Sequence, residues 1–191
     1  GTYYVGGTSE LLRNNAVQIL NEEKVQLDNY RFLGNYNADI QLADGLNFRT
    51  ALGADIAYTH DYVYYNQYHP YGLGAGRLTD QTRLTSNMLF ENTLNYKHDF
   101  GRLNLSMLAG HSFQKFVQHD NLTDGSGFPS PSFDVNSVAA VILAASTGLS
   151  ENSIESYFSR AILNFDDKYL LSASISADGS SRFAPTKRYG Y

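Results

Sequence analysis

The sequence is organised as pairs of long alternating segments that are joined by very short turns. In segment 29–42, apolar and small residues alternate with polar ones, and the same alternation returns in 47–62 after Asp44 and Gly45. Alternation with a period of two is typical of a strand with one apolar and one polar face. An Asp-Gly pair accepts the positive φ angles of a tight hairpin. The sequence therefore predicts a β-hairpin over 29–62.

Two more hairpins are predicted, over 85–118 with a turn at 99–102 and over 153–178 with a turn at 166–168. These segments are longer than the about 5 to 6 residues typical of soluble strands. Long antiparallel strands with alternating short and long connections are typical of an outer-membrane barrel. We therefore expect an all-β, antiparallel up-and-down transmembrane β-barrel segment of about six strands and three hairpins, incomplete as a barrel. The expected lipid-facing side chains include Tyr30, Phe32, Leu52, Ile56, Met88, Phe90, Met107, Phe113, Leu163, Leu171 and Ile175.

The predicted organisation is one partial barrel domain over 1–191. Its hairpins are 29–62, 85–118 and 153–178, and its expected extracellular loops are 1–28, 63–84, 119–152 and 179–191. Alternation alone does not decide the class, because a soluble glycan-binding β-sandwich also alternates. A porin-like or adhesin barrel without energised gating is a second alternative. The deciding question is whether the apolar faces meet acyl chains or a second sheet.

Composition narrows the possible classes. The chain has 15 Tyr and 11 Phe, and only 17% of its residues are charged, which favours strands. It has no Cys, which excludes a disulfide framework and thiolate metal sites. No stretch approaches the roughly 20 apolar residues of a spanning helix, and the longest apolar run, 138–145, is left unassigned. The net charge of −5 and the scattered basic residues argue against a nucleic-acid partner.

The two ends of the sequence give a separate expectation. The chain begins with Gly1 rather than Met, has no secretion signal, and stops at Tyr191 in the middle of a pattern. We therefore expect it to be an excerpt from a longer protein.

The C-terminal third carries a family resemblance. Segments 156–160, 167–174 and 188–190, together with Asp178, Gly179, Ser180, Ser181, Arg182 and Phe183, resemble the signature stretch of the SusC/RagA family of TonB-dependent outer-membrane receptors. The Asp-Gly-Ser-Ser-Arg-Phe run is its most specific part. Ser159 departs from the family pattern, where Gly is common, and so does Ser176, where a basic residue is common.

The resemblance implies a fragment of a large barrel that is filled by an N-terminal plug and energised by the TonB complex through a TonB box. It also implies a SusD-like surface lipoprotein that helps to capture oligosaccharides or peptides at the outer membrane of a Gram-negative bacterium. Plug and TonB box are not expected within this chain. Because an open sheet leaves unpaired edges in lipid, only the closed parent barrel could span the membrane and transport.

The tyrosine-rich loop 61–71 is the candidate binding site. Tyr65, Tyr68 and Tyr71 offer flat faces and hydroxyl groups that suit a glycan or a partner surface. The alternative is an aromatic girdle at the membrane interface, to which Tyr62 and Tyr64 are assigned.

The remaining motifs are interpreted as structural. The family residues from Asp178 to Phe183 favour a chain reversal at the end of a strand. The glycines at 72, 74 and 76 lack the Lys-Ser/Thr ending and helix of a phosphate loop. The five His show no metal-ligand spacing, and the carboxylate pairs show no catalytic arrangement. We therefore expect no metal, no cofactor and no enzymatic activity.

Overall fold

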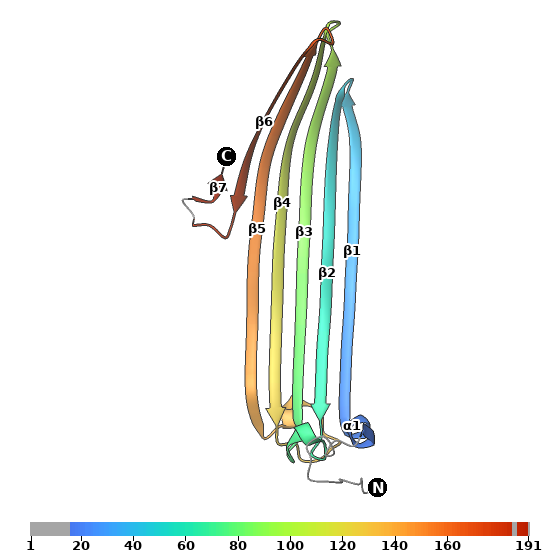
Figure 1. Cartoon of the computed structure of the whole chain (residues 1–191), viewed down its shortest axis with the longest axis vertical. Helices are drawn as coiled ribbons and strands as arrows, with labels where there is room; N and C mark the ends of the chain where they lie inside the picture. Colours follow the sequence, from blue (N-terminus) through green and yellow to red (C-terminus); the bar gives the residue numbers. More distant parts are fainter. Residues whose placement is uncertain (1–15, 185–186, 191) are drawn as a thin grey trace. The chain divides into compact units, whose positions relative to one another are not determined.

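The computed structural model describes residues 16–184 and 187–190. Within these residues a short helix precedes seven strands, which form one sheet in sequence order (Figure 1). No helix in this part of the chain is long and apolar enough to cross a membrane. The elements are α1 (Ala16–Glu22), β1 (Glu23–Ala43), β2 (Leu46–Tyr65), η2 (Pro70–Gly72), β3 (Arg77–Asp99), β4 (Leu103–Ser126), η3 (Asn136–Val138), β5 (Val141–Phe165), β6 (Tyr169–Ser180) and β7 (Tyr189–Gly190).

The chain divides into two compact units. Unit 1 contains the described residues up to Tyr30, with Ala57–Leu84 and His119–Leu149, and unit 2 contains Arg31–Ile56, Thr85–Gln118 and Ser150–Tyr191. Strands β1 to β5 contribute residues to both units. The long connections belong to unit 1 and the three short turns to unit 2.

The short turns have the backbone that the sequence predicts. Gly45 and Gly101 have φ angles of 73° and 78°, in the left-handed region that glycine adopts without steric cost. Asp166 and Asp167 provide the third reversal, with φ angles of 57° and 52°. Asp tolerates this region better than most residues because its short side chain forms local hydrogen bonds. The predicted all-β fold with three hairpins is confirmed.

The predicted apolar faces are exposed on a single sheet. In the β5–β6 pair, Tyr157 lies opposite Ala177 and Leu163 opposite Leu171, so the apolar side chains of the two strands lie together. Ile175 is 70% exposed. All described strands belong to this sheet, so no second layer covers their apolar faces. The soluble sandwich alternative is therefore wrong, since a soluble domain buries such faces.

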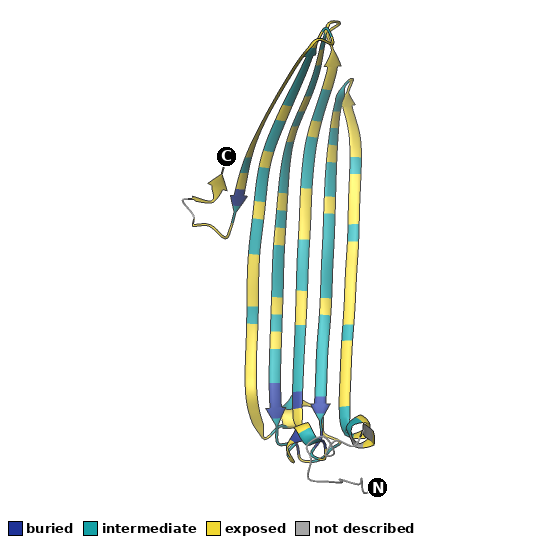
Figure 2. Cartoon of the chain, viewed as in Figure 1, coloured by how far each residue is buried: buried dark blue, intermediate teal, exposed yellow. Residues whose placement is uncertain are grey.

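The described hydrophobic core is small and lies in unit 1. Tyr64, Leu78 and Phe128 are 2%, 1% and 5% exposed, and Tyr62 and Ala139 pack against them. Figure 2 shows buried strand positions in dark blue at the ends of β2, β3 and β4 that lead into the long connections, and at the C-terminal end of β6. Burial elsewhere along the strands is intermediate or absent, as expected of a wall whose two faces contact something other than this chain.

In unit 1 the apolar face ends at a pair of stacked tyrosines. The rings of Tyr30 and Tyr58 have centroids 6.5 Å apart. Two residues further toward the long connections, the same faces carry Asp28 on β1 and His60 on β2. Aromatic rings followed by charged or polar groups are typical of the boundary between hydrocarbon and water. This is where we place the edge of the apolar band on these strands.

Unit 2 repeats this transition. On β4 the apolar face ends at Phe113 and the next residue on that face is Lys115. On β5 the corresponding residues are Tyr157 and Glu155. Strands β1, β2, β4 and β5 therefore each carry an aromatic residue that is followed on the same face by an ionisable residue.

The strands extend further than the sequence analysis expected. β1 begins at Glu23 rather than at 29, β4 continues to Ser126 rather than 118, and β5 begins at Val141 rather than 153. On β3 and β4 the residues near the long connections are mostly polar, so hydrophobic alternation gives little signal there. The run 138–145, left unassigned from sequence, supplies the start of β5 from Val141 onward. Of the expected first loop, residues 1–15 lie outside the described residues.

Candidate functional site

The face opposite the apolar one carries paired polar side chains. In unit 2 the Arg31 guanidinium donates two hydrogen bonds to the Asp55 carboxylate, at 2.7 and 2.6 Å. Gln114 donates to Asn87 at 2.9 Å across β3 and β4. Hydrogen-bonded polar side chains of this kind are typical of the inner face of a barrel wall. We refer to this side as the inner face and to the apolar side as the outer face.

In unit 1 the inner face contains a pocket with a volume of about 410 Å³. It lies at the ends of β2 and β3, where loop 66–76 joins them. Because side chains alternate along β2, Val63 and Tyr65 point away from the side on which Tyr62 and Tyr64 are packed. The pocket is lined by Val63, Tyr65, Tyr71, Leu73, Arg77 and Thr79.

The two aromatic rings that line this pocket, Tyr65 and Tyr71, both contact the ring of His69. Tyr65 stacks on His69 with centroids 4.5 Å apart, and Tyr71 contacts both rings at 5.6 and 5.4 Å. The turn that holds them is a 3-10 helix, Pro70–Gly72, which His69 caps by accepting a hydrogen bond from the Tyr71 amide. At Gly72 a Cβ would lie 1.9 Å from the Asn66 carbonyl oxygen, so the turn requires glycine there.

His69 is held in its neutral form. Its side chain is 1% exposed, and this burial lowers the pKa of the imidazole. Nδ1 accepts from the Tyr71 amide at 3.1 Å, so the proton of the neutral ring is on Nε2. Nε2 lies 3.7 Å from the Glu23 carboxylate, too far for a hydrogen bond. His69 therefore acts as a rigid platform for Tyr65 rather than as a charged group.

Arg77 gives the pocket its positive charge. Its guanidinium donates to the Asp124 carboxylate at 3.0 and 2.6 Å, and this pairing raises the pKa of Arg77, which remains charged. The Arg77 side chain is 47% exposed, whereas the Asp124 side chain is 11% exposed. The buried carboxylate thus fixes an accessible cation beside the rings. The pocket can hold a flat or apolar group and one hydrogen-bond acceptor.

The structure brings together only part of the predicted site. Tyr65 and Tyr71 share the pocket, whereas Tyr68, 65% exposed, does not line it. Sequence reasoning missed His69 and Arg77. A signal for His69 was its position inside the tyrosine run, but the pairing of Arg77 with Asp124 joins residues far apart in sequence and left no local signal.

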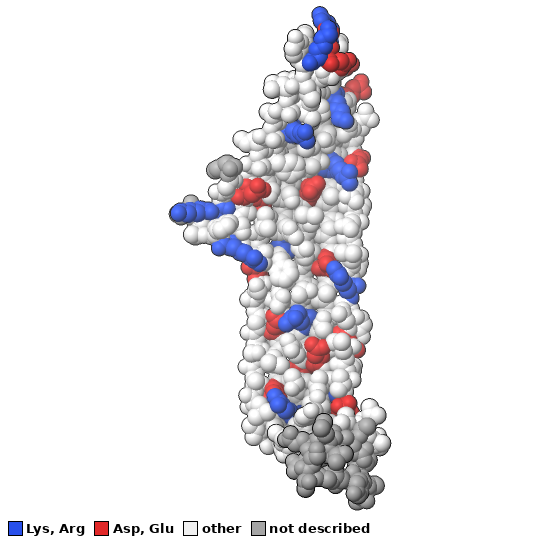
Figure 3. Space-filling model, in the orientation of Figure 1, with Lys and Arg blue, Asp and Glu red and all other residues white. Residues whose placement is uncertain are grey.

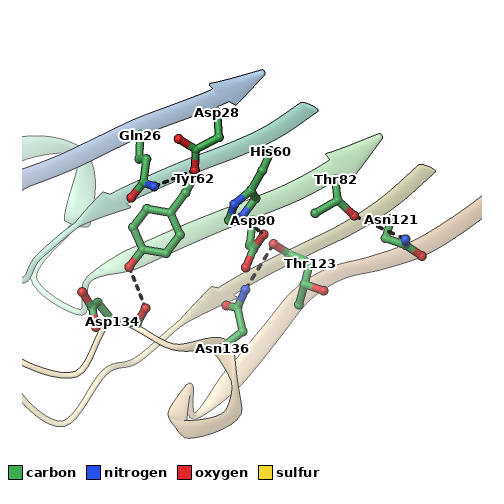
Figure 4. A network of polar contacts seen from close by, with 10 residues as sticks. All are labelled: Gln26, Asp28, His60, Tyr62, Asp80, Thr82, Asn121, Thr123, Asp134 and Asn136. Carbon is green, nitrogen blue, oxygen red and sulfur yellow. Dashed lines mark hydrogen bonds and ion pairs between the residues drawn. The ribbon is translucent and has the colours of Figure 1, made fainter. Parts of the chain in front are cut away.

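The outer face of unit 1 is covered by loop 127–140. The Tyr62 hydroxyl donates to the Asp134 carbonyl oxygen at 2.7 Å, and Asn136 donates to the Thr123 carbonyl oxygen at 3.3 Å (Figure 4). Lys24 also forms an ion pair with the Asp134 carboxylate. Tyr64 is buried against Phe128. The assignment of Tyr62 and Tyr64 to an aromatic girdle is therefore wrong, because the loop covers both rings.

The family motif closes the end of β6 in unit 2. Ser181 donates its amide to the Ser153 carbonyl oxygen at 2.9 Å, and its hydroxyl accepts from the Ser153 amide at 2.8 Å. A Cβ on Gly179 would lie 2.7 Å from the Tyr189 ring, so glycine lets this ring lie against the strand. Tyr189 then donates to the Glu155 carboxylate at 2.7 Å. Arg182 and Phe183, also in the motif, are exposed.

Charged side chains of both signs are interspersed on the face drawn in Figure 3. Among the described residues, no group of three or more His, Cys, Asp and Glu is arranged to hold a metal ion.

Comparison with known proteins identifies relatives of the chain. No family model matches it. TonB-dependent receptor P3 of Formosa agariphila is 31% identical over 100% of this chain and 19% of its own length, and TonB-dependent receptor P39 of the same organism is 28% identical over 79% and 15%. The chain thus spans about a fifth of the length of these relatives or less.

Solved structures agree on the fold. The RagAB peptide transporter superposes with a TM-score of 0.80 at 22% identity, covering 89% of this chain and 20% of that one. The RagAB peptide importer in its open-open state gives 0.79, with 89% and 19% covered. A single sheet with an exposed apolar face and a polar inner face is a segment of a transmembrane β-barrel wall. The chain belongs to the TonB-dependent receptors, of which it spans a segment.

Proposed function

We propose that this segment is part of the wall of an outer-membrane importer of a Gram-negative bacterium that takes up oligosaccharides or peptides. The inner-face pocket around Tyr65, Tyr71 and Arg77 is the observation on which the proposal rests. A tyrosine ring stacks on a sugar ring or an apolar peptide side chain, and the guanidinium binds a hydroxyl, carbonyl or carboxylate oxygen. The pocket faces the barrel interior, which a substrate must cross.

The second part of the proposal is the partner. A SusD-like lipoprotein covers the long connections, which carry large apolar side chains in contact with solvent. Leu73 is 84% exposed in loop 66–76, and Phe133 and Val135 are 49% and 51% exposed in loop 127–140. Exposed apolar groups on ordered loops are typical of a protein interface.

Uptake by the full-length receptor tests the pocket. Tyr65→Ala and Arg77→Ala each remove a ring or a charge from the lining, and we expect substrate affinity to fall by about tenfold, the size of a lost stacking or charge-assisted contact. Tyr68→Ala is the matched control, because it removes a tyrosine of the same loop that does not line the pocket. Equal losses for Tyr65→Ala and Tyr68→Ala would contradict the proposal.

Copurification tests the partner. Leu73→Asp and Phe133→Asp should reduce the amount of lipoprotein recovered with the receptor, while Leu171→Ala on the outer face of β6 should leave it unchanged. Full recovery with both loop variants would remove the lipoprotein from these loops.

A further inference from the structure

Two hollows in unit 2 share one side chain, Phe113. The first is apolar, has a volume of about 460 Å³ and lies on the outer face of β1 to β4. The second is smaller, about 150 Å³, and is lined mostly by polar residues of β5 and the β6–β7 region. Phe113 lines both, so the apolar hollow adjoins the polar one.

The apolar hollow arises from small residues set among large ones. The small residues Gly34 and Ala54 and the aromatic residues Phe32, Tyr36 and Phe90 all line it. At Gly34 a Cβ would lie 2.9 Å from the Phe32 ring, so this glycine lets the ring lean over the strand. The volume is within the range of about 300 to 1,000 Å³ for small-molecule sites. On the lipid-facing side of a barrel, an acyl chain is the group that fills such a hollow.

The polar hollow offers donors and one cation. Ser180 Oγ accepts from the Arg182 amide at 3.3 Å and Ser181 Oγ accepts from the Ser153 amide at 2.8 Å, which leaves each hydroxyl proton to donate elsewhere. No carboxylate among the described residues lies within ion-pair distance of the Arg188 guanidinium. Figure 3 shows basic side chains projecting where Figure 1 draws the chain between β6 and β7.

The carboxylate in this hollow is already engaged. Glu155 accepts hydrogen bonds from His111 at 3.0 Å, Tyr157 at 2.8 Å and Tyr189 at 2.7 Å. These three donors use most of the acceptor capacity of the carboxylate. They also reduce its electrostatic repulsion of a neighbouring anion. The donors left for a ligand are the guanidinium of Arg188 and the two hydroxyls, which together match the oxygens of a phosphate.

We propose that these joined hollows are a binding site for one phosphate-bearing lipid of the outer membrane, whose acyl chain lies in the apolar hollow and whose phosphate binds Arg188, Ser180 and Ser181. The position of Phe113, at the end of the apolar face of β4, places the junction of the hollows where chain and headgroup of a lipid meet. The inference rests on the proposed membrane location, but not on the substrate or the lipoprotein partner.

Native mass spectrometry of the full-length receptor tests this. The receptor is released from detergent with lipid A, with phosphatidylethanolamine, or with diacylglycerol that has the same acyl chains as the phosphatidylethanolamine. We expect one phosphate-bearing lipid to be retained and diacylglycerol to be lost. Arg188→Ala should lower retention of the phosphate-bearing lipid by about tenfold, the size of a lost charge-assisted hydrogen bond. The matched control is Lys187→Ala, which removes an exposed cation that does not line the hollow.

A second variant tests the apolar hollow, the proposed site of the acyl chain, separately. Ala54→Leu fills the apolar hollow and should lower retention, whereas Ala38→Leu adds the same atoms to the outer face of β1 outside the lining. Equal retention of phosphate-bearing lipid and diacylglycerol, or no effect of both Arg188→Ala and Ala54→Leu, would overturn the site. A change of oligomeric state in Ala54→Leu without lipid loss would assign the hollow to a second copy instead. Substrate uptake is measured in parallel, so that failure of this site is distinguishable from failure of the proposed function.

Discussion

The stacked rings of Tyr30 and Tyr58, 6.5 Å apart, mark the point at which the outer face of β1 and β2 changes from apolar to polar. On the turn side of this pair the outer face of β2 carries Leu52 and Ala54, and on the other side it carries His60. The pair therefore divides the residues that contact lipid from those that contact water or loop 127–140. The depth of each position in the membrane follows from its distance along the strand from this pair.

Charge insertion along β2 should reveal this depth. In the full-length receptor, Leu52→Arg should destabilise the barrel by about 2–4 kcal/mol, since it places a cation well inside the hydrocarbon. Tyr58→Arg, six residues along the same face, should cost about 0–1 kcal/mol because the cation reaches the headgroups. The free energy of unfolding in denaturant measures both. Equal costs would contradict the proposed boundary.

Gly45 holds the first hairpin against its neighbour. Its carbonyl oxygen accepts from the Lys97 amide at 2.8 Å, and a Cβ on Gly45 would lie 1.9 Å from the Lys97 carbonyl oxygen. Gly45→Ala should therefore cost more than the roughly 1 kcal/mol of a strained positive φ alone. Gly101→Ala is the control, since Gly101 has a similar φ angle and nothing within 4 Å of its Cβ position. Similar losses of stability in the two variants would show that the close approach to Lys97 is unimportant.

Docking of loop 127–140 should depend on pH at both extremes. Burial raises the pKa of Tyr62 and Tyr64. Their contribution to the stability of the docked loop is therefore complete below about pH 10, the ordinary tyrosine value, and is lost as pH rises above it. The Lys24 ammonium lowers the pKa of Asp134, whose contribution is lost as pH falls below about 4. Amide exchange in 127–140, corrected for the intrinsic rate, should be slowest between these values.

A tyrosine variant isolates the alkaline part of this response. Tyr62→Phe removes the hydrogen bond to Asp134 together with the ionisable group. The loop should then exchange faster at pH 7 and respond less to a rise above pH 10. An unchanged alkaline response in Tyr62→Phe would assign it to another group.

The sequence predicted those parts of the fold in which one face meets lipid. Ile175 and its neighbours on β6 alternate strictly with serines, so hydrophobicity alone located the strand and its apolar face. At the start of β1, Lys24 and Asp28 lie on the outer face and Val25 and Leu27 on the opposite face. The apolar residues change from one face of the strand to the other between Leu27 and Tyr30. This change interrupts the pattern from which the strand was predicted, so the extra length of β1 was missed.

The sites depend on contacts that sequence order does not specify. Tyr65 and Tyr71 are close in sequence and could be grouped by their aromatic character. Arg77 joins them only because β2 and β3 are paired and Asp124 anchors the guanidinium from β4. Likewise, Phe113 lines one hollow with residues of β1, β2 and β3 and another with residues of β5, β6 and β7, and sequence order does not specify how these strands are aligned.

The central claim is that the outer face contacts acyl chains, and nitroxide labels along β6 test it most directly. Single cysteines are introduced at positions 172 to 177 of the full-length receptor, in a segment that has no native Cys, and are labelled after reconstitution in lipid. We predict that labels at Ala173, Ile175 and Ala177 are accessible to oxygen, which partitions into hydrocarbon, and protected from a water-soluble nickel chelate. Labels at Ser172, Ser174 and Ser176 should show low oxygen accessibility. Loss of this two-residue period, or its reversal, would contradict the account.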